Sequence, residues 1–261
     1  AYAGQLLTTN ETEPNPIQIA TTNEFNKIYV GATNTFAIKN NGTLWGCGSN
    51  QQGRLGVNSS TEFFYSFQQI TTATNWVKVA PSYFHTIALK ADGTIWGWGL
   101  NNNYQTGNTP ASLNQPIPLQ IGTDTDWVEI ATGTNDISFA IKSNGTIWGW
   151  GSNPSSIIVS GSGTTTVSTP TQVGTGNDWV KMSVGAQHIL AQKQDGTLWS
   201  WGGGEKISIR GTPSITNIPQ QISTDIWKFF SAGSNTSFGI KNDGTLWAWG
   251  RNNNGQLGLG H

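Results

Sequence analysis

One ten-residue motif recurs five times along this chain of 261 residues. A representative copy reads Lys142-Ser-Asn-Gly-Thr-Ile-Trp-Gly-Trp-Gly151, and the copies begin at Lys39, Lys90, Lys142, Lys193 and Lys241. Successive copies are 51, 52, 51 and 48 residues apart. A fixed period of this length means that the chain must fold as adjoining copies of one supersecondary unit.

Each unit predicts four short strands. The Asn-Gly or Asp-Gly pair inside the motif is a strong hairpin signal, because both central residues of a type I′ turn need positive φ. In the second unit it joins a strand over 86–90 to a strand over 94–98. An aromatic-led run such as Trp76-Val-Lys-Val79 precedes this hairpin, and a run such as Pro118-Leu-Gln-Ile121 closes the unit. The proline of that last run lacks an amide donor, which suits an edge strand.

Four-stranded units of about 40 to 50 residues with glycine and aromatic signatures describe a β-propeller. We therefore expect an all-β fold, a single propeller domain over 1–261 made of five four-stranded antiparallel blades. The repeats run approximately over 16–65, 66–116, 117–168, 169–217 and 218–261. Residues 1–19 carry a spare Pro16-Ile-Gln-Ile19 run, whereas nothing of this kind follows Trp247 and Trp249. We expect this segment to be the outer strand of the last blade and to close the ring; the alternative is an arc cut from a longer array.

Charge and composition exclude several classes of function. Only 10% of the residues are charged, against about 25% in an average protein, and 13 basic side chains face 14 acidic ones. This balance offers no attraction to nucleic acid or to an anionic membrane. One cysteine and three histidines leave little for a metal centre, so we expect no metal and no cofactor. No apolar run approaches the roughly 20 residues needed for membrane insertion. A surface rich in Asn, Thr, Ser and Gln is typical of extracellular or cell-surface proteins.

Most of the unusual residues fall on repeated scaffold positions. All 13 tryptophans occupy three such positions and predict packing between blades. Cys47 replaces one of them and is expected to fill space. The five motif lysines are expected to be solvated hairpin residues. The acids that precede the first strand of a unit are expected to be ordinary turn residues, although a ring of them could hold a cation; they are Glu24, Asp126, Asp178 and Asp225.

The repeats resemble those of the regulator of chromosome condensation family. The resemblance rests on the Lys-x-Asp-Gly-Thr-Leu-Trp-x-Trp-Gly hairpin and on a closing Asn-x-x-Gly-Gln-Leu-Gly element, present as Asn50–Gly56 and Asn252–Gly258. That element is degenerate over 104–107 and missing from the third and fourth units. The resemblance implies the propeller fold. A secreted β-lactamase inhibitor of propeller type is the closest functional analogue, which implies an aromatic-lined loop face that caps a protein.

The units differ most in two of their four connections, between the first and second strands and between the third and fourth. In an antiparallel meander these loops leave from one face. Loops on a rigid scaffold commonly carry binding, and their aromatic, isoleucine and arginine side chains match interface chemistry. The predicted partner-binding residues are Phe63, Phe64, Tyr65, Tyr83, Phe84, His85, Tyr104, Asn135, Asp136, Ile157, Ile158, Gln187, His188, Lys206, Arg210 and Asn235. The two histidines are expected to form loop hydrogen bonds, and the alternative is that Phe63, Phe64 and Ile157 tuck under their own loops.

Together these features predict a monomeric, non-catalytic scaffold that binds a macromolecule, most of all a protein, through this variable face. A lectin-like or adhesive carbohydrate-binding module is the first alternative, and it would need similar side chains at equivalent loop positions. A glycosidase or lyase is the second alternative. It would need two carboxylates about 5 to 10 Å apart, and Glu129 and Asp136 are the candidates for that role.

Overall fold

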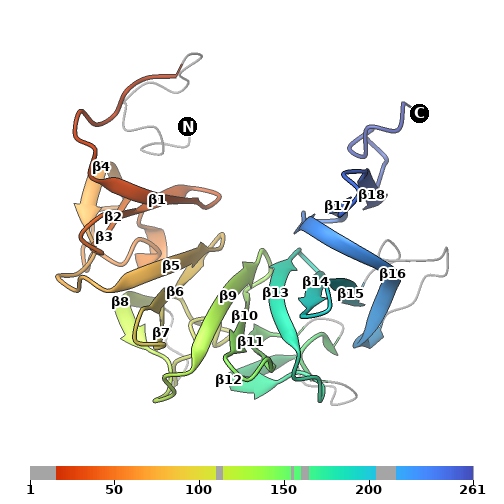
Figure 1. Cartoon of the computed structure of the whole chain (residues 1–261). Helices are drawn as coiled ribbons and strands as arrows, with labels where there is room; N and C mark the ends of the chain where they lie inside the picture. Colours follow the sequence, from red (N-terminus) through yellow and green to blue (C-terminus); the bar gives the residue numbers. More distant parts are fainter. Residues whose placement is uncertain (1–15, 110–113, 154–155, 160–164, 204–215, 261) are drawn as a thin grey trace. The chain divides into compact units, whose positions relative to one another are not determined.

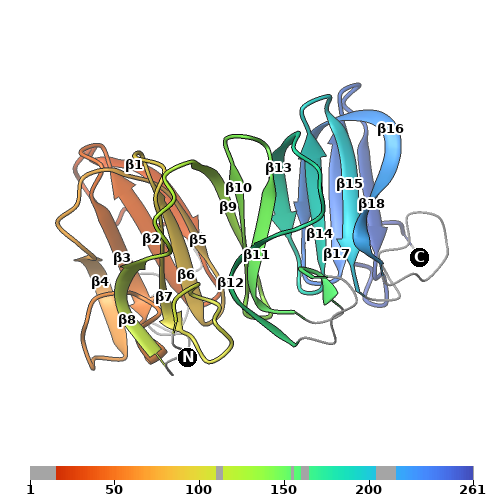
Figure 2. The ribbon, with the colours of Figure 1, turned by 90° about the horizontal axis from the view of Figure 1, so that it is seen from below.

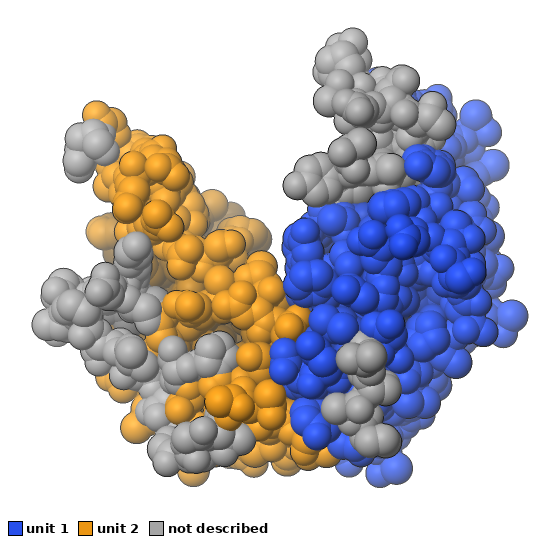
Figure 3. All heavy atoms as spheres, turned by 180° about the vertical axis from the view of Figure 1, so that it is seen from behind, with its two compact units in different colours: residues 1–130 blue, residues 131–261 orange. Residues whose placement is uncertain are grey.

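The computed structural model describes residues 16–109, 114–153, 156–159, 165–203 and 216–260. Its strands form four antiparallel sheets, and the strands of each sheet run side by side in Figures 1 and 2. Two compact units, Ala1–Ile130 and Ala131–His261, are coloured in Figure 3. The single domain expected from the sequence stays a prediction.

The first two sheets each have four strands in sequence order, as the repeat predicts. The first contains β1 (Phe25–Val30), β2 (Asn34–Lys39), β3 (Leu44–Ser49) and β4 (Phe63–Gln69). A short 3₁₀ turn, η1 (Gln51–Gly53), follows β3. The second contains β5 (Trp76–Pro81), β6 (His85–Lys90), β7 (Ile95–Leu100) and β8 (Asn114–Gln120).

The remaining strands form one four-stranded and one six-stranded sheet. The third sheet contains β9 (Trp127–Gly133), β10 (Ile137–Lys142), β11 (Ile147–Ser152) and β12 (Thr166–Gln172). The six-stranded sheet contains β13 (Trp179–Val184), β14 (His188–Lys193), β15 (Thr197–Gly202), β16 (Thr216–Ala232), β17 (Thr236–Lys241) and β18 (Leu246–Gly250).

Strand β16 differs from the prediction of separate fourth and fifth blades. Its first part pairs with β15, where Gln221 lies opposite Trp199, and its second part pairs with β17, where Trp227 lies opposite Lys241. One continuous strand therefore serves as the outer strand of the fourth blade and the inner strand of the fifth. Among the described residues the fifth blade has three strands, and residues 16–20 form none.

The predicted hairpins share one register in all five repeats. In the first, Ile38 lies opposite Leu44, and in the second Leu89 lies opposite Ile95. The same pairing recurs as Ile141 with Ile147, Gln192 with Leu198 and Ile240 with Leu246. Gly42 and Gly93 each have a φ of 77°, but Asn41 and Asp92 are not among the residues with positive φ. The predicted type I′ turn is therefore wrong. The Gly42 amide donates to the Lys39 carbonyl at 2.9 Å, which fits a type I turn followed by a left-handed glycine.

The core lies between neighbouring blades, as predicted for the tryptophans. In the first unit one apolar cluster joins Phe36, Leu44 and Leu55 of the first blade to Trp76 and Trp98 of the second. In the second unit a cluster joins the third and fourth blades, and a smaller one joins the fourth and fifth. Trp98 and Trp201 are 0% and 1% exposed within these clusters, so they hold adjacent blades together rather than forming an exposed sugar platform.

Candidate functional site

The antiparallel topology brings two kinds of loop to the same end of every blade. We call this the loop end; it comprises the loops 31–33, 82–84, 134–136, 185–187 and 233–235 after the inner strands, and the loops 50–62, 101–113, 153–165 and 203–215 after the third strands, so far as the structure describes them. The opposite hairpin end carries the turns inside the repeated motif. The sequence predicted binding at the loop end.

An aromatic pair at the loop end of the first unit sits on a buried arginine. Tyr83 and Phe84 have ring centroids 4.5 Å apart and meet edge to face. The Arg54 guanidinium lies 5.8 Å from the Tyr83 ring and 5.3 Å from the Phe84 ring. Tyr83 is 41% exposed, whereas Arg54 is 3% exposed. Tyr83 therefore presents an exposed aromatic ring, and the buried Arg54 guanidinium beneath it holds the ring in place through a cation–π contact.

Hydrogen bonds hold Arg54 against both blades. Its Nη1 donates to the Thr33 hydroxyl at 3.1 Å and to the Tyr83 carbonyl at 3.0 Å, and its Nη2 donates to the Gln52 side chain at 2.7 Å. Burial lowers the pKa of Arg54 from its ordinary value, yet a guanidinium stays charged at neutral pH. Arg54 is not among the binding residues predicted from the sequence. Its signal was an arginine in the closing element where the last unit has Gln256.

An asparagine pins the third-to-fourth strand loop of four repeats. In the first, the Asn50 side chain accepts a hydrogen bond from the Leu55 amide and donates to the Ser59 carbonyl at 2.9 Å. The same bond recurs in three other repeats, where the amides of Thr106, Ile158 and Leu257 donate to the side-chain oxygens of Asn101, Asn153 and Asn252. The closing element judged missing from the third repeat is therefore present in structure, with Ile157 and Ile158 in the places of Arg54 and Leu55.

Backbone strain gathers at the loop end. The described residues other than glycine with positive φ are all in these loops: Gln52, Asn58, Tyr104, Asp136 and Ser156. Such conformations cost of order 1 kcal/mol or more and persist where the surroundings enforce them, which is common at functional sites. Predicted binding residues Tyr104 and Asp136 belong to this group, and both are half-buried.

In the compact unit 131–261, each loop after an inner strand is hydrogen-bonded to the corresponding loop of the next blade. The Asn135 side chain donates to the Ala186 carbonyl at 2.9 Å, and the Ala186 amide donates to the Ser234 carbonyl at 3.2 Å. Asn135, Gln187 and Asn235 are exposed beside these bonds, as predicted for a binding surface. Their binding role stays a prediction.

Three predicted residues lie in a strand rather than in a loop. Phe63, Phe64 and Tyr65 begin β4, where Phe63 pairs with Ser49 and Phe64 with Gly48. Phe64 packs against the core of the first unit, and Phe63 is half-buried. The prediction that these three residues lie in a loop is therefore wrong, because they pair with β3. In a strand, successive side chains point to opposite faces. Tyr65 is 44% exposed but lies on β4, outside the loop end.

Four other predicted residues are buried and do not belong to the exposed surface. Ile157 and Ile158 are 1% and 3% exposed, because the loop of Asn153 folds them into the core. His85 and His188 are 0% and 3% exposed at the starts of β6 and β14. Lys206 and Arg210 lie outside the described residues.

The two predicted histidines lie in the interior of the blades. His188 Nε2 lies 2.8 Å from the Ser237 hydroxyl of the next blade, which confirms the predicted hydrogen-bonding role. Burial lowers the pKa of His188 to about 4 and that of His85 to about 3. Both imidazoles are therefore neutral at physiological pH.

The motif lysines at the hairpin end are not simply solvated. Lys90 Nζ lies 3.8 Å from the Trp96 ring centroid and 4.7 Å from that of Trp76, and Lys39 has the same arrangement with Trp45 and Phe25. The strand places lysine and tryptophan on one face, so the stem covers the ring. Three of the predicted turn acids pair with these lysines: Glu24 with Lys39 at 2.9 Å, Asp178 with Lys193 at 3.2 Å and Asp225 with Lys241 at 2.8 Å.

Groups suited to catalysis are already engaged or buried. Glu129 accepts a hydrogen bond from Lys78, whose pKa burial lowers to about 8, with Lys27 adding repulsion. Cys47 is 1% exposed, and burial raises its pKa to about 12, so it fills space as predicted. Within the described ranges no three His, Cys, Asp or Glu side chains gather into a metal site. No helix in that part of the chain has the length and apolarity to cross a membrane.

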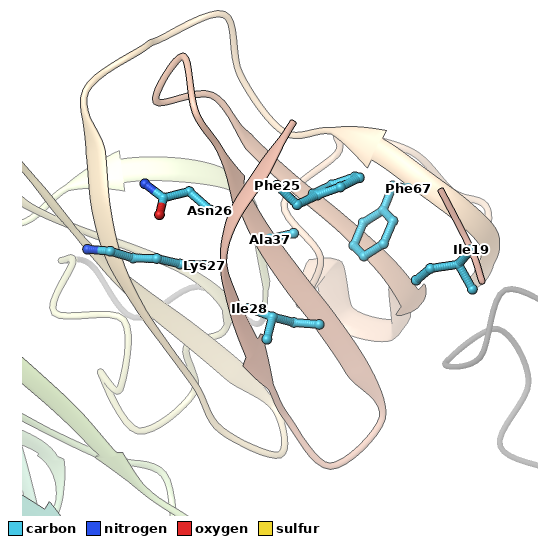
Figure 4. Close-up of a pocket in the computed structure, with 7 residues that line it drawn as sticks. All are labelled: Ile19, Phe25, Asn26, Lys27, Ile28, Ala37 and Phe67. Atoms are coloured by element: carbon cyan, nitrogen blue, oxygen red, sulfur yellow. The ribbon is translucent and has the colours of Figure 1, made fainter. Parts of the chain in front are cut away.

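An apolar pocket lies on the first blade, away from the loop end (Figure 4). It has a volume of about 310 Å³ and is lined by Ile19, Phe25, Asn26, Lys27, Ile28, Ala37 and Phe67. The same face of the second blade, which carries Val79, packs against the first blade. Ile28 is 62% exposed, whereas Val79 at the equivalent position is 2% exposed. The pocket therefore lies on the face of the first blade whose equivalent in the second blade is buried.

Two patterns of the regulator of chromosome condensation (RCC1) repeat match this sequence. One matches residues 25–54, 76–105 and 227–256, and the other matches 41–89 and 92–141. The chain belongs to the RCC1 repeat family. Human HERC6, a probable E3 ubiquitin-protein ligase, is 27% identical over 197 residues, which cover 72% of this chain and 19% of HERC6. The ultraviolet-B receptor UVR8 of Arabidopsis thaliana is 26% identical over 181 residues, covering 68% of this chain and 41% of UVR8.

Solved structures show the same RCC1 fold. Human WBSCR16 superposes with a TM-score of 0.79 at 19% identity and covers 91% of this chain and 64% of its own. Prp20p from Saccharomyces cerevisiae superposes with a TM-score of 0.71 at 22% identity and covers 87% of this chain and 58% of its own. The chain thus spans less than two thirds of each of these relatives, and the propeller architecture is what they share with it.

Proposed function

We propose that this RCC1-type chain is a non-catalytic binding scaffold that recognises a protein through its loop end. The observation that carries the proposal is the exposed Tyr83 ring, fixed by Phe84 and by the buried Arg54. Rigid aromatic side chains beside arginine are the chemistry of interface hot spots, since little rotamer entropy is lost on binding.

Features of the family support a protein partner. RCC1-like propellers are protein-interaction scaffolds, and the yeast relative Prp20p is described with binding properties to Gsp1p and histones. A second structure holds it bound by Kap60. The net charge of −1 offers no attraction to nucleic acid, so we propose a protein rather than DNA as the partner. The low charge and the Asn- and Thr-rich surface support an extracellular or cell-surface location.

We further propose that the five blades form one monomeric propeller, closed by the segment 1–19, without metal or cofactor. A non-catalytic role is supported by the ion pair that engages Glu129 and by the burial of His85 and His188. The side chain at the position of Tyr83 changes from repeat to repeat, to Ala32, Asn135, Ala186 and Ser234, which weighs against repeated sugar sites.

The test compares two exposed tyrosines in affinity capture. Tyr83→Ser removes the ring at the loop end, and Tyr65→Ser is the matched control, because Tyr65 is exposed to a similar extent but lies on β4. Wild-type protein and both variants are immobilised, incubated with secreted and surface proteins of the source cells, and compared by quantitative mass spectrometry. We expect Tyr83→Ser alone to lose the captured protein, by roughly tenfold or more for a hot-spot residue.

Circular dichroism must be unchanged in both variants for the comparison to count. Equal capture by wild type and Tyr83→Ser would refute the loop-end site. Glycan-array binding by the wild type without a captured protein would instead support the carbohydrate alternative.

A further inference from the structure

Arg54 carries a buried positive charge that no negative group of the described chain balances. The side chain is 3% exposed, and its four described acceptors are neutral: the Gln51 and Tyr83 carbonyls, the Thr33 hydroxyl and the Gln52 side-chain oxygen. Burial lowers the pKa of Arg54, and no described carboxylate offsets that effect. A buried charge is costly unless a partner of opposite charge compensates it. A carboxylate would therefore gain more at this arginine than at an exposed one.

The second and fifth repeats place a neutral side chain where the first has Arg54. Gln105 and Gln256 hold the equivalent position. Each of these glutamines accepts a hydrogen bond at 2.8 Å from the amide two residues before it, that of Asn103 or Asn254. An arginine side chain has no acceptor, so it cannot make this bond. The first repeat has therefore exchanged a bond that closes its own loop for a buried cation.

Gln52 supplies the acceptor of Arg54 that is easiest to displace. It is an exposed residue, and its Oε1 accepts a hydrogen bond from Arg54 Nη2 at 2.7 Å. Of the other acceptors, two are backbone carbonyls and the Thr33 hydroxyl is half-buried. Gln52 has a φ of 60°, whereas its equivalents Asn103 and Asn254 are not among the residues with positive φ. This conformation is unfavourable for a residue other than glycine, so release of the Gln52 side chain would relieve strain.

We propose that Arg54 is the receptor for a carboxylate of the protein partner, which replaces the Gln52 side chain on Nη2 and lies beside the exposed Tyr83 ring. A carboxylate accepts a charge-assisted hydrogen bond from the guanidinium, roughly twice as strong as the neutral bond that it replaces. The Tyr83 ring, 5.8 Å from the guanidinium, shields the ion pair from water. This inference rests on the loop-end function proposed above and names the chemistry that the loop end recognises.

A carboxylate built into the loop tests this chemistry without a partner. In Gln52→Glu an acidic oxygen takes the place of the amide oxygen on Nη2. We expect this variant to resist urea better than wild type at pH 7 and to lose the advantage toward pH 3. The ion pair lowers the carboxyl pKa, so its contribution is complete above the unfolded value of about 4.3 and is lost as the pH falls through the lowered value.

The matched background is Arg54→Gln, because glutamine is the natural residue at this position of the second and fifth repeats. Adding Gln52→Glu to Arg54→Gln should raise the resistance to urea by much less than adding it to wild type, since the cation is gone. An equal gain in both backgrounds, or no gain in wild type, overturns the proposal.

The capture experiment separates this inference from the proposed function. We expect Gln52→Glu to lose the captured protein by about tenfold, because its own carboxylate occupies Arg54, whereas Gln52→Ala retains it. If Tyr83→Ser loses the protein and Gln52→Glu does not, the loop-end function stands and the carboxylate receptor is overturned. If wild type and Tyr83→Ser capture equally, the loop-end function fails, and the carboxylate chemistry of Arg54 is still decided by the urea measurements and by peptide binding.

Peptide probes distinguish an acidic side chain from a chain end as the source of the carboxylate. The chain has three arginines, so isotope-labelled arginine gives few side-chain signals in nuclear magnetic resonance, and the signal lost in Arg54→Gln belongs to Arg54. The probes are three tripeptides: one blocked at both ends with a central glutamate, one of glycines with a free carboxyl end, and a blocked control with a central glutamine.

We expect the glutamate peptide to shift the Arg54 signal and to bind about tenfold more tightly than the glutamine peptide. Tighter binding by the peptide with the free carboxyl end would also support a carboxylate receptor and would identify a chain end as the source. Equal binding of all three peptides, or no shift of the Arg54 signal, overturns the proposal.

Discussion

The hairpin end of the blades repeats the same side-chain bonds in every repeat, whereas the side chains of the loop end differ between blades. At the hairpin end every repeat uses the same bonds, illustrated by the second blade. The Thr94 hydroxyl donates to the Asp92 carboxylate at 2.6 Å and accepts from the Trp96 indole at 2.9 Å, and Lys90 lies over that ring. The hydrogen bonds from Thr94 also hold the pKa of Asp92 below its ordinary value. The equivalent threonine-to-tryptophan bond occurs in all five repeats.

At the loop end the recurrent element is the asparagine that pins the loop, and the side chains around it change from blade to blade. Arg54 becomes Gln105 in the second blade and Ile157 in the third. This contrast shows where a repeat protein tolerates variation in sequence. Each hairpin end must pack against its neighbours in the same way, whereas a loop that is pinned at its base is free to change the chemistry it presents.

Trp98 joins the loop end to the core, and replacing it should have the greatest effect on stability. Trp98 is completely buried, and its indole donates to the Arg54 carbonyl at 3.0 Å. We expect Trp98→Ala to lower the free energy of unfolding by about 3–5 kcal/mol, the usual cost of removing a buried tryptophan, measured by urea denaturation. A loss of this size would show that the loop end, although its sequence varies, is anchored to the core through Trp98.

Trp247→Ala is the matched control for this prediction, because Trp247 is half exposed on β18. We expect a smaller loss of stability than for Trp98→Ala. Similar losses in the two variants would contradict the idea that the interblade tryptophans anchor the loop end.

The loop end is expected to make the stability of the protein depend on pH through a buried histidine. His188 is buried at the loop end beside Ser237, and its pKa is lowered to about 4. The unfolded chain therefore binds more protons between pH 4 and about 6.5, so stability is complete above pH 6.5 and falls as the pH falls toward 4. Relative to pH 7.5, we expect His188 to account for about 2–3 kcal/mol of lost stability at pH 4.5.

His188→Asn tests this assignment, because Asn34 occupies the equivalent position of the first blade. Stability measured by urea denaturation at both pH values should fall less on acidification in this variant than in wild type. An unchanged pH dependence would remove His188 as its source.

The hairpin end was predictable from sequence, and much of the loop end was not. Asn-Gly and Asp-Gly turns, the period of two and the spacing of the motif are local signals, so the strands followed from them. The register did not, because a type I′ turn would place Lys90 opposite Ile95, whereas Leu89 lies opposite Ile95. The long strand β16 was not visible, because nothing in the run around Ser223 marks whether a strand breaks between blades. The sequence predicts solvated lysines, since composition does not show that a lysine stem covers a tryptophan ring.

At the loop end, prediction failed where a tertiary contact decides burial. Ile157 and Ile158 read as an exposed apolar run, and the bond from Asn153 folds them inward. An asparagine five residues before a buried position, shared by Asn50 and Asn153, was the signal that could have revealed it. Arg54 was missed because its significance depends on the Tyr83 loop of the next blade, 29 residues away in sequence.

Two threonines of the hairpin end test whether the repeats are energetically equivalent. Thr94 and Thr197 have the same exposure, 8%, and form the same bonds to a turn aspartate and to an indole. We expect Thr94→Ala and Thr197→Ala each to cost about 1 kcal/mol in urea denaturation, because each leaves one indole donor without its acceptor. The double variant should lose the sum of the two costs, since distant independent sites are additive. Unequal costs, or a double variant that departs from the sum by more than about 0.5 kcal/mol, would show that repeats with the same bonds do not share the same energetics.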